Sequence, residues 1–205
     1  ELKVPERMND SLAEIIGYFM GDGSLHSKGL RFCVDNKDED VVQRIRKLSR
    51  DLFNKEVIIN QRKGYKEVVI QSVPLTIWWD ACGFSKIKPS EFHKGKGYIP
   101  YIPDAILHSN NRKIYSAFLK GLFEADGTII TGVPSLSTTN YQFSQEIKIL
   151  LFSLGYATTT KVNISEWGES EVYALRLKNI SYNKKFIEDI GFIGKRKSES
   201  ISVIR

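Results

Sequence analysis

The strongest constraint on the fold is that the chain contains the same pattern twice. Residues 11–23 (SLAEIIGYFMGDG) align with residues 115–127 (YSAFLKGLFEADG) at a spacing of 104 residues. Asp22 then pairs with Asp126, and the glycine after each aspartate is matched as well. Self-similarity at a fixed spacing is typical of a repeated structural unit. The sequence therefore predicts a tandem duplication whose halves are related by a pseudo-two-fold axis.

The match continues downstream of these segments. At the same spacing a helical apolar stripe in the first half meets one in the second: Asn36 with Asn140, and Ile45, Leu48 and Leu52 with Ile149, Phe152 and Tyr156. The spacing later grows by four, so that Gly83 meets Gly191, as a longer hairpin in the second half would require. We predict a first repeat over residues 1–88, a linker over 89–111 and a second repeat over 112–205.

Hydrophobic periodicity predicts helix, two strands, helix, two strands and helix in each repeat. In the first helix Ser11 and Glu14 have capping-box spacing, and Asp22-Gly23 marks its end. The expected fold class is α+β, a pseudo-two-fold tandem repeat of αββαββα units.

Small residues recur every fourth position in the first helix of each repeat: Ala13, Gly17 and Gly21, and Ala117, Gly121 and Ala125. Such a row lies on one helix face. Glycine inside a helix costs about 1 kcal/mol relative to alanine, so another interaction must compensate. We expect the two bare faces to pack against each other more closely than the roughly 8–10 Å usual between helix axes.

That packing would place Asp22 and Asp126 side by side at two helix C-termini. The helix dipole disfavours a carboxylate there, and two carboxylates repel each other and raise a pKa. A divalent cation would relieve this repulsion, and an oxygen-only ligand set favours Mg²⁺ or Mn²⁺ over zinc.

Residues 15–23 (IIGYFMGDG) and 119–127 (LKGLFEADG) resemble the two signature helices of monomeric LAGLIDADG homing endonucleases of the intron- or intein-encoded type. The resemblance covers essentially the whole chain. The first motif departs from the family where Met20 replaces an acidic residue and where Tyr18 and Phe19 are bulky.

The resemblance implies two four-stranded antiparallel sheets that form a saddle on double-stranded DNA, with the paired helices at the repeat interface. It implies a double-strand break in a long asymmetric target by metal-dependent phosphodiester hydrolysis. Asp22 and Asp126 would be catalytic and would bind Mg²⁺, for which Mn²⁺ could substitute, with Gly21 and Ala125 also at the metal site.

The family often adds a basic residue near the end of each repeat. In the first repeat Lys94 and Lys96 are the candidates, ahead of Lys86 and Lys88. In the second repeat they are Lys195 and Lys197. We assign the role to Lys96 and Lys197.

Side chains alternate between the two faces of a strand, so polar residues at every second position can line a DNA groove. Arg and Lys suit guanine edges, and Asn and Gln suit adenine. The predicted DNA contacts differ between the repeats: Lys28, Arg31, Gln61, Lys63, Lys66 and Gln71 in the first, and Thr160, Lys161, Asn163, Arg176 and Lys178 in the second. The target should therefore be at best an imperfect palindrome.

Composition adds little to this. The net charge of +6 agrees with a polyanionic partner without requiring one. No apolar run of about 18 residues and no secretory signal are visible, so we expect a monomeric protein that is cytoplasmic, or organellar if encoded there, and neither secreted nor in a membrane. The ends lack the residues that protein splicing needs, so we expect no splicing; a free-standing, intron-encoded or intein-derived origin stays open.

Two alternatives keep the same fold without DNA cleavage. The chain could be an intron-RNA maturase, or a DNA-binding protein that does not cut. Retention of both Asp22 and Asp126 favours the nuclease, because a pure binding protein gains nothing from their repulsion.

Overall fold

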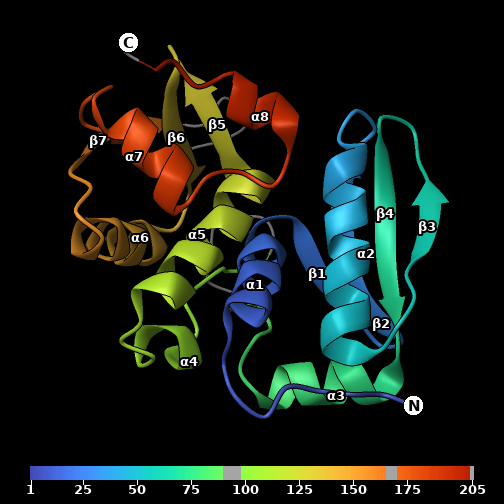
Figure 1. Ribbon diagram of the computed structural model, residues 1–205. Helices are drawn as coiled ribbons and strands as arrows, with labels where there is room; N and C mark the ends of the chain where they lie inside the picture. Colours follow the sequence, from blue (N-terminus) through green and yellow to red (C-terminus); the bar gives the residue numbers. More distant parts are fainter. Residues whose placement is uncertain (90–97, 165–169, 204–205) are drawn as a thin grey trace.

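The computed structural model describes residues 1–89, 98–164 and 170–203. These residues form two similar halves, with helices α1 and α5 side by side at the centre and one sheet on either side (Figure 1). The predicted order αββαββα is confirmed in both halves, and α8 follows the second. The chain is an α+β protein built as a tandem repeat.

The bounds of the elements follow the repeat. The first half contains α1 (Asp10–Asp22), β1 (Gly23–His26), β2 (Gly29–Asp35), α2 (Glu39–Phe53), β3 (Ile58–Gln61), β4 (Tyr65–Gln71) and α3 (Val73–Ala81). The segment between the halves contains α4 (Asp104–Leu107). The second half contains α5 (Arg112–Asp126), β5 (Gly127–Ile130), β6 (Val133–Thr138), α6 (Tyr141–Ser153), β7 (Thr158–Ile164), β8 (Glu171–Leu177), α7 (Tyr182–Asp189) and α8 (Lys195–Glu199).

Each half has one four-stranded antiparallel sheet with the same strand order, β1-β2-β4-β3 and β5-β6-β8-β7. In β2, Leu30, Phe32 and Val34 are buried. Arg31 and Cys33 alternate with them and belong to the opposite face. Each sheet therefore has a face covered by helices and an open face.

The central helices are buried because they contact both the partner helix and their own sheet. Ile15, Ile16 and Phe19 of α1 are fully buried, and the ring of Phe19 packs edge-on against Phe32 of β2 and Trp79 of α3. The hydrophobic core thus holds each central helix on its sheet, which fixes where the helix ends.

The start of α1 differs from the prediction. Asn9, and not Ser11, caps the helix, because the Asn9 side chain accepts a hydrogen bond from Leu12 N at 2.9 Å. Glu14 is buried instead, and its carboxylate accepts two hydrogen bonds from Arg44 of α2, at 2.8 and 2.7 Å. The capping-box interpretation was wrong because tertiary packing claims the glutamate.

The repeat alignment also shifts by two residues at α6. Ile45 and Leu48 of α2 are buried, but Ile149 and Phe152 of α6 are 68% and 73% exposed. Asn140 caps α6 at the position that Asp38 holds before α2, so the spacing of the repeats is 102 there. The predicted match of the two apolar stripes was therefore wrong, because the second half is two residues shorter between its sheet and this helix.

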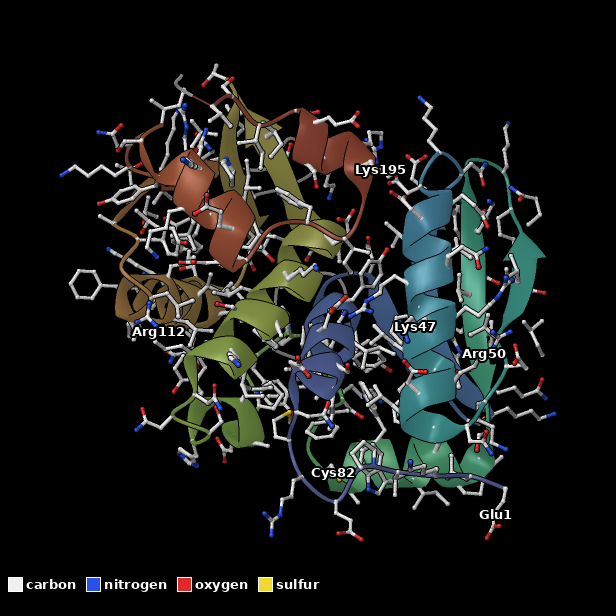
Figure 2. The ribbon with its side chains drawn as sticks, in the orientation of Figure 1. Glu1, Lys47, Arg50, Cys82, Arg112 and Lys195 are labelled. Carbon is white, nitrogen blue, oxygen red and sulfur yellow. The ribbon has the colours of Figure 1, made fainter. Side chains whose placement is uncertain are left out.

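The outer surface of α2 is charged. Lys47 and Arg50 lie on its exposed side (Figure 2), where they pair with Asp51 and Glu56. Among the described residues, no helix combines the length and the apolarity needed to cross a membrane.

Candidate active site

The two central helices touch through their backbones. A Cβ atom on Gly17 would lie 2.0 Å from the carbonyl oxygen of Phe118, and a Cβ atom on Gly121 would lie 2.0 Å from that of Glu14. No side chain fits at either position, which explains why glycine occurs inside both helices. The predicted packing of the two bare faces is confirmed.

This packing brings the C-terminal ends of α1 and α5 together. A Cβ atom on Gly21 would lie 2.4 Å from the Ala125 Cβ and 3.1 Å from the carboxyl carbon of Asp126. Asp22 and Asp126 are the last residues of their helices, and β1 and β5 begin at the following glycines, Gly23 and Gly127. Both carboxylates therefore lie where helix turns into strand, on either side of the pseudo-two-fold axis.

Both aspartates are electrostatically unfavourable in the absence of a cation. They reach solvent, but the surrounding protein withholds enough water to raise both pKa values. Burial and then the charge of Asp126 raise the pKa of Asp22 to about 6, against the opposing effect of Lys86 and Lys197. The carboxyl groups thus influence each other, as the sequence analysis expected from their position.

Two lysines face this pair, one from each half. The ammonium of Lys86, which follows α3, donates to the carbonyl of Gly21 at 2.5 Å. The ammonium of Lys197 in α8 donates to the carbonyl of Gly127 at 2.7 Å and to that of Glu124. Burial lowers the pKa of both lysines, while nearby carboxylates, Asp126 for Lys86 and Glu124 for Lys197, counteract this.

The lysine assignments have different outcomes. Lys197 lies at the site as predicted, whereas Lys94 and Lys96 lie outside the described residues. Lys86, ranked below them from sequence, is the first-half lysine found beside the aspartates. Lys88 is exposed, and the backbone N–H of Lys195 binds Asp40 at 2.7 Å.

The donor set suits a divalent cation. Asp22 and Asp126 contribute carboxylate oxygens, and the carbonyls of Gly21 and Ala125 lie on the same helix ends. Mg²⁺ commonly binds through one or two carboxylates together with waters and substrate phosphates. Over the described ranges, no group of three or more His, Cys, Asp and Glu side chains could hold a metal ion.

The strand register places the predicted DNA contacts on two different faces. On the first sheet Arg31 and Gln71 belong to the open face, and Lys28 and Lys63 lie in the turns at its ends. On the second sheet Lys161, Asn163 and Arg176 share the open face, and Lys178 continues it. These residues of the two halves are available to a ligand that spans both sheets.

Three predicted contacts lie on the opposite face. Gln61 pairs with Lys66 in the ladder, in phase with the buried Val68 and Ile70. Lys66 is only 18% exposed and binds Glu39 of α2 at 2.6 Å. Thr160 shares its face with the buried Leu175. A shift of one residue moves a side chain to the other face, which is why polar type alone could not assign these positions.

Sequence reasoning also missed open-face residues. Ser24 pairs with Arg31, Asn60 pairs with Glu67, and Thr159 pairs with Arg176. Taking every second residue from Arg31 and from Lys161 would have selected the correct phase in these strands.

With this geometry established, comparison with known proteins identifies the fold. Residues 113–191, which span α5 to α7, match the family model of the LAGLIDADG-like domain. The homing endonuclease I-DmoI, in mesophilic variants, has a TM-score of 0.63 at 17% identity over 89% of this chain and 95% of that chain. The chain carries a LAGLIDADG-like domain and has the LAGLIDADG fold of I-DmoI.

Further structures have the same fold. I-DmoI in complex with DNA and Mn has a TM-score of 0.61 at 18% identity, over 89% of this chain and 98% of that chain. The N-terminal LAGLIDADG domain of DUF199/WhiA has a TM-score of 0.56 at 16% identity, over 89% and 82% of the two chains. I-DmoI has also been crystallised with DNA in the presence of Mg and of Ca.

Three curated relatives carry unrelated names. The replication factor C small subunit of Methanocaldococcus jannaschii is 25% identical over 94% of this chain, and the glutamine–fructose-6-phosphate aminotransferase of the same organism is 28% identical over 99%. An A-type ATP synthase subunit of Pyrococcus horikoshii is 29% identical over 93%. The chain spans only 10%, 18% and 20% of the lengths of these relatives.

Proposed function

We propose that this protein is a site-specific endodeoxyribonuclease that makes a double-strand break with the help of Mg²⁺ or Mn²⁺. The observation that carries the proposal is the pair Asp22 and Asp126 on glycine-packed helix ends, each with a lysine beside it. A fold under selection only for stability would not place two carboxylates at adjacent helix C-termini. The duplicated geometry provides one half-site for each DNA strand.

The residues of the site have distinct roles in this proposal. Asp22 and Asp126 would hold the metal, with Gly21 and Ala125 as neighbouring carbonyl donors. When bound, the cation would supply Lewis-acid activation of water and neutralisation of the leaving oxygen. Lys86 and Lys197 place positive charge beside the carboxylates, where it would stabilise negative charge that develops on a scissile phosphate.

The open faces of the two sheets would bind the target. Lys and Arg contacts to phosphates give salt-dependent affinity, and contacts to base edges give sequence preference. The open faces differ in their side chains, with Arg31 and Gln71 on one and Lys161, Asn163 and Arg176 on the other. A monomer that binds an asymmetric duplex follows from this difference, because both half-sites lie in one chain.

A binding protein that does not cleave is the main rival, whether it recognises DNA or intron RNA. The fold alone does not decide, because the LAGLIDADG domain of DUF199/WhiA shares it. The aspartate pair favours cleavage. With the pKa of both aspartates raised, the metal-free site carries an electrostatic cost that a bound cation would relieve.

The relatives support a second part of the proposal, that this chain is a module inserted into host proteins, as an intein-type endonuclease is. An aminotransferase, a subunit of replication factor C and one of an ATP synthase share a segment that is a fifth of their length or less. Such a segment does not supply any of their different activities. An endonuclease that spreads its own coding segment accounts for its presence in all three.

A cleavage assay tests both parts. A plasmid library of randomised duplexes, incubated with the protein and Mg²⁺, should yield one linearised target, and Asp22→Asn and Asp126→Asn should each abolish the double-strand break. Asp51→Asn, on the exposed side of α2, should cut like the parent. A duplex joining the two DNA sequences that flank the coding segment of this chain should be cleaved, whereas the occupied locus should resist. Undiminished cutting by both active-site variants would overturn the assignment.

A further inference from the structure

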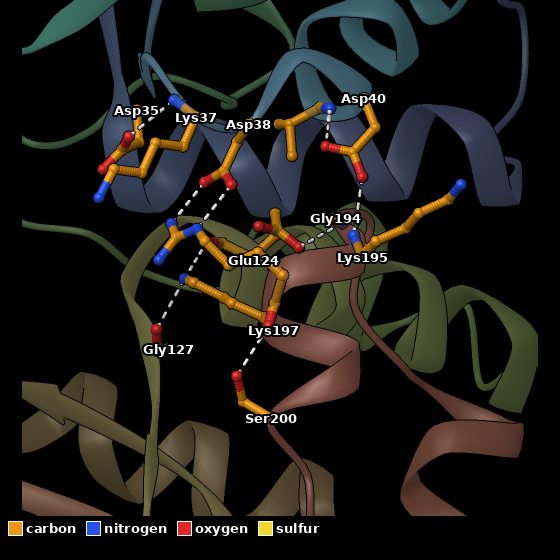
Figure 3. A network of polar contacts seen from close by, with 12 residues as sticks. Asp35, Lys37, Asp38, Asp40, Glu124, Gly127, Gly194, Lys195, Lys197 and Ser200 are labelled. Carbon is orange, nitrogen blue, oxygen red and sulfur yellow. Dashed lines mark hydrogen bonds and ion pairs between the residues drawn. The ribbon is translucent and has the colours of Figure 1, made fainter.

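The short helix α8 is anchored at its start by three carboxylates from both halves of the molecule. Glu124 of α5 accepts the backbone N–H of Gly194 at 2.8 Å, and Asp40 of α2 accepts that of Lys195 at 2.7 Å. Asp38 accepts two hydrogen bonds from the guanidinium of Arg196, at 2.7 and 2.5 Å. Figure 3 shows these contacts converging on α8. We call Asp38, Asp40 and Glu124 the α8 clamp.

The clamp joins the two repeats. Asp38 and Asp40 belong to the start of α2 in the first half, and α8 belongs to the second half (Figure 1). The side chain of Asp38 is only 8% exposed, so its pair with Arg196 is shielded from water. Figure 2 places Lys195 at this junction between α8 and α2.

Lys197 comes directly after the clamped residues. Its ammonium reaches the carbonyls of Glu124 and Gly127 on either side of Asp126. A lysine side chain has several rotatable bonds, so it keeps one position only if its backbone is fixed. The clamp fixes the backbone and side chains of the three preceding residues.

The first half holds its lysine differently. Lys86 donates to the carbonyl of Gly21, and within the part of the chain that the structure describes, no carboxylate hydrogen-bonds or ion-pairs with residues 83–88. At the position equivalent to Glu124 the first half has Met20, which is buried in the core. The acidic residue of the motif is therefore present in the repeat where it anchors the element that carries the lysine.

We propose that Asp38, Asp40 and Arg196 are positioning residues that hold Lys197 at the second half-site, so that the first repeat controls cleavage of one DNA strand. The inference rests on the proposed nuclease function. Loss of the clamp should give an enzyme that cuts one strand at the normal rate and the other slowly.

The first experiment needs no DNA. Competitive labelling with acetic anhydride, read by mass spectrometry, reports how accessible each lysine is. Asp38→Asn and Arg196→Ala should raise the labelling rate of Lys197 by about fivefold or more and leave that of Lys86 unchanged. Arg44→Ala is the matched control, because it breaks the buried Glu14 pair on the same helix without touching α8. Unchanged labelling of Lys197 in both clamp variants would overturn the proposal.

The second experiment resolves the two strands. A target selected from a randomised duplex library is labelled on each strand and cut in Mg²⁺. Asp38→Asn should slow one strand about tenfold, with the other strand within about twofold of the parent. Arg196→Lys should recover part of the loss, and Arg44→Ala should keep the parental strand ratio.

A double variant separates positioning from general damage. Asp38→Asn combined with Lys197→Ala should cut no more slowly than Lys197→Ala alone, because the clamp acts through the lysine. Equal slowing of both strands, or additive losses in the double variant, would refute the clamp. If the parent cuts neither strand, the nuclease proposal fails, and the labelling experiment still decides whether the clamp holds Lys197.

Discussion

The carbonyl oxygen of Phe118 lies 2.0 Å from the point where a Cβ atom on Gly17 would stand. Real Cβ atoms do not approach an oxygen so closely, so the backbones of α1 and α5 can meet only because residue 17 has no side chain. The same relationship holds between Gly121 and Glu14. This contact places Asp22 beside Asp126 and therefore determines the geometry of the site.

Gly17→Ala should strongly destabilise the protein. Alanine raises helix propensity by about 1 kcal/mol, but its methyl group must push two packed helices apart, and we expect a net loss of about 3 kcal/mol or more. Urea denaturation measures the change, with Lys113→Ala on an exposed turn of α5 as the control. A Gly17→Ala protein as stable as the parent would show that the helices do not pack this closely.

Asp22→Asn should stabilise the metal-free protein at neutral pH. The pKa of Asp22 is about 6 in the folded protein and 3.8 in the unfolded chain, so ionisation opposes folding. The cost is absent below about pH 4, grows between about pH 4 and 6, and stays constant above that range. Allowing for solvent screening of an exposed group, we expect a gain of about 1 kcal/mol at pH 7.5 and none at pH 3.5. Urea titrations at both pH values test this; Asp51→Asn should not show the pattern.

Divalent cations should stabilise the parent and not an aspartate variant. A ligand at ten times its Kd stabilises the state that binds it by about 1.4 kcal/mol. We expect Mn²⁺ to raise the melting temperature of the parent and to have no such effect on the Asp22→Asn, Asp126→Asn double variant. An equal shift in both proteins would place the ion elsewhere.

Lys86→Ala should slow DNA cleavage without weakening DNA binding. Loss of one charge that stabilises a developing oxyanion typically costs about 10²–10³ in rate. We expect nicked intermediates to accumulate, because Lys197 still serves the other half-site. Lys88→Ala, two residues away and exposed, is the control. Parental cleavage of both strands by Lys86→Ala would remove Lys86 from the site.

Lys161→Ala should weaken DNA binding, and Lys66→Ala should not. Lys161 lies on the open face of its sheet, whereas Lys66 faces α2 and pairs with Glu39. Removing one phosphate contact should reduce the slope of log K against log salt by about 1. Binding is measured in Ca²⁺ over a range of salt concentrations. Equal effects of the two variants would mean that the open faces are not the DNA-binding surface.

The sequence predicted the duplication, the order of elements in each half and the packing of the two bare helix faces. These features depend on local patterns: spacing of glycines, periodicity of apolar residues and repetition of a motif. The aspartate pair followed from the same patterns, because a helix face and a helix end are fixed by counting residues along one element.

Tertiary structure decided what counting along the chain could not. Glu14 pairs with Arg44, Lys86 reaches Gly21, and Arg196 binds Asp38 from the other repeat. The sequence separations of these contacts are 30, 65 and 158 residues. Such partners are chosen by packing between elements, and they show no periodicity that a sequence could display.

The strand faces show the same division. Alternation along a strand was evident from the sequence, but which alternate set faces the helices depends on the register with neighbouring strands, and Gln61, Lys66 and Thr160 fell on the covered side. The sequence by itself determined the repeated unit and the two carboxylates. Only the tertiary structure determined which lysines join them and which side chains are open to DNA, because those positions arise from contacts between segments far apart in the chain.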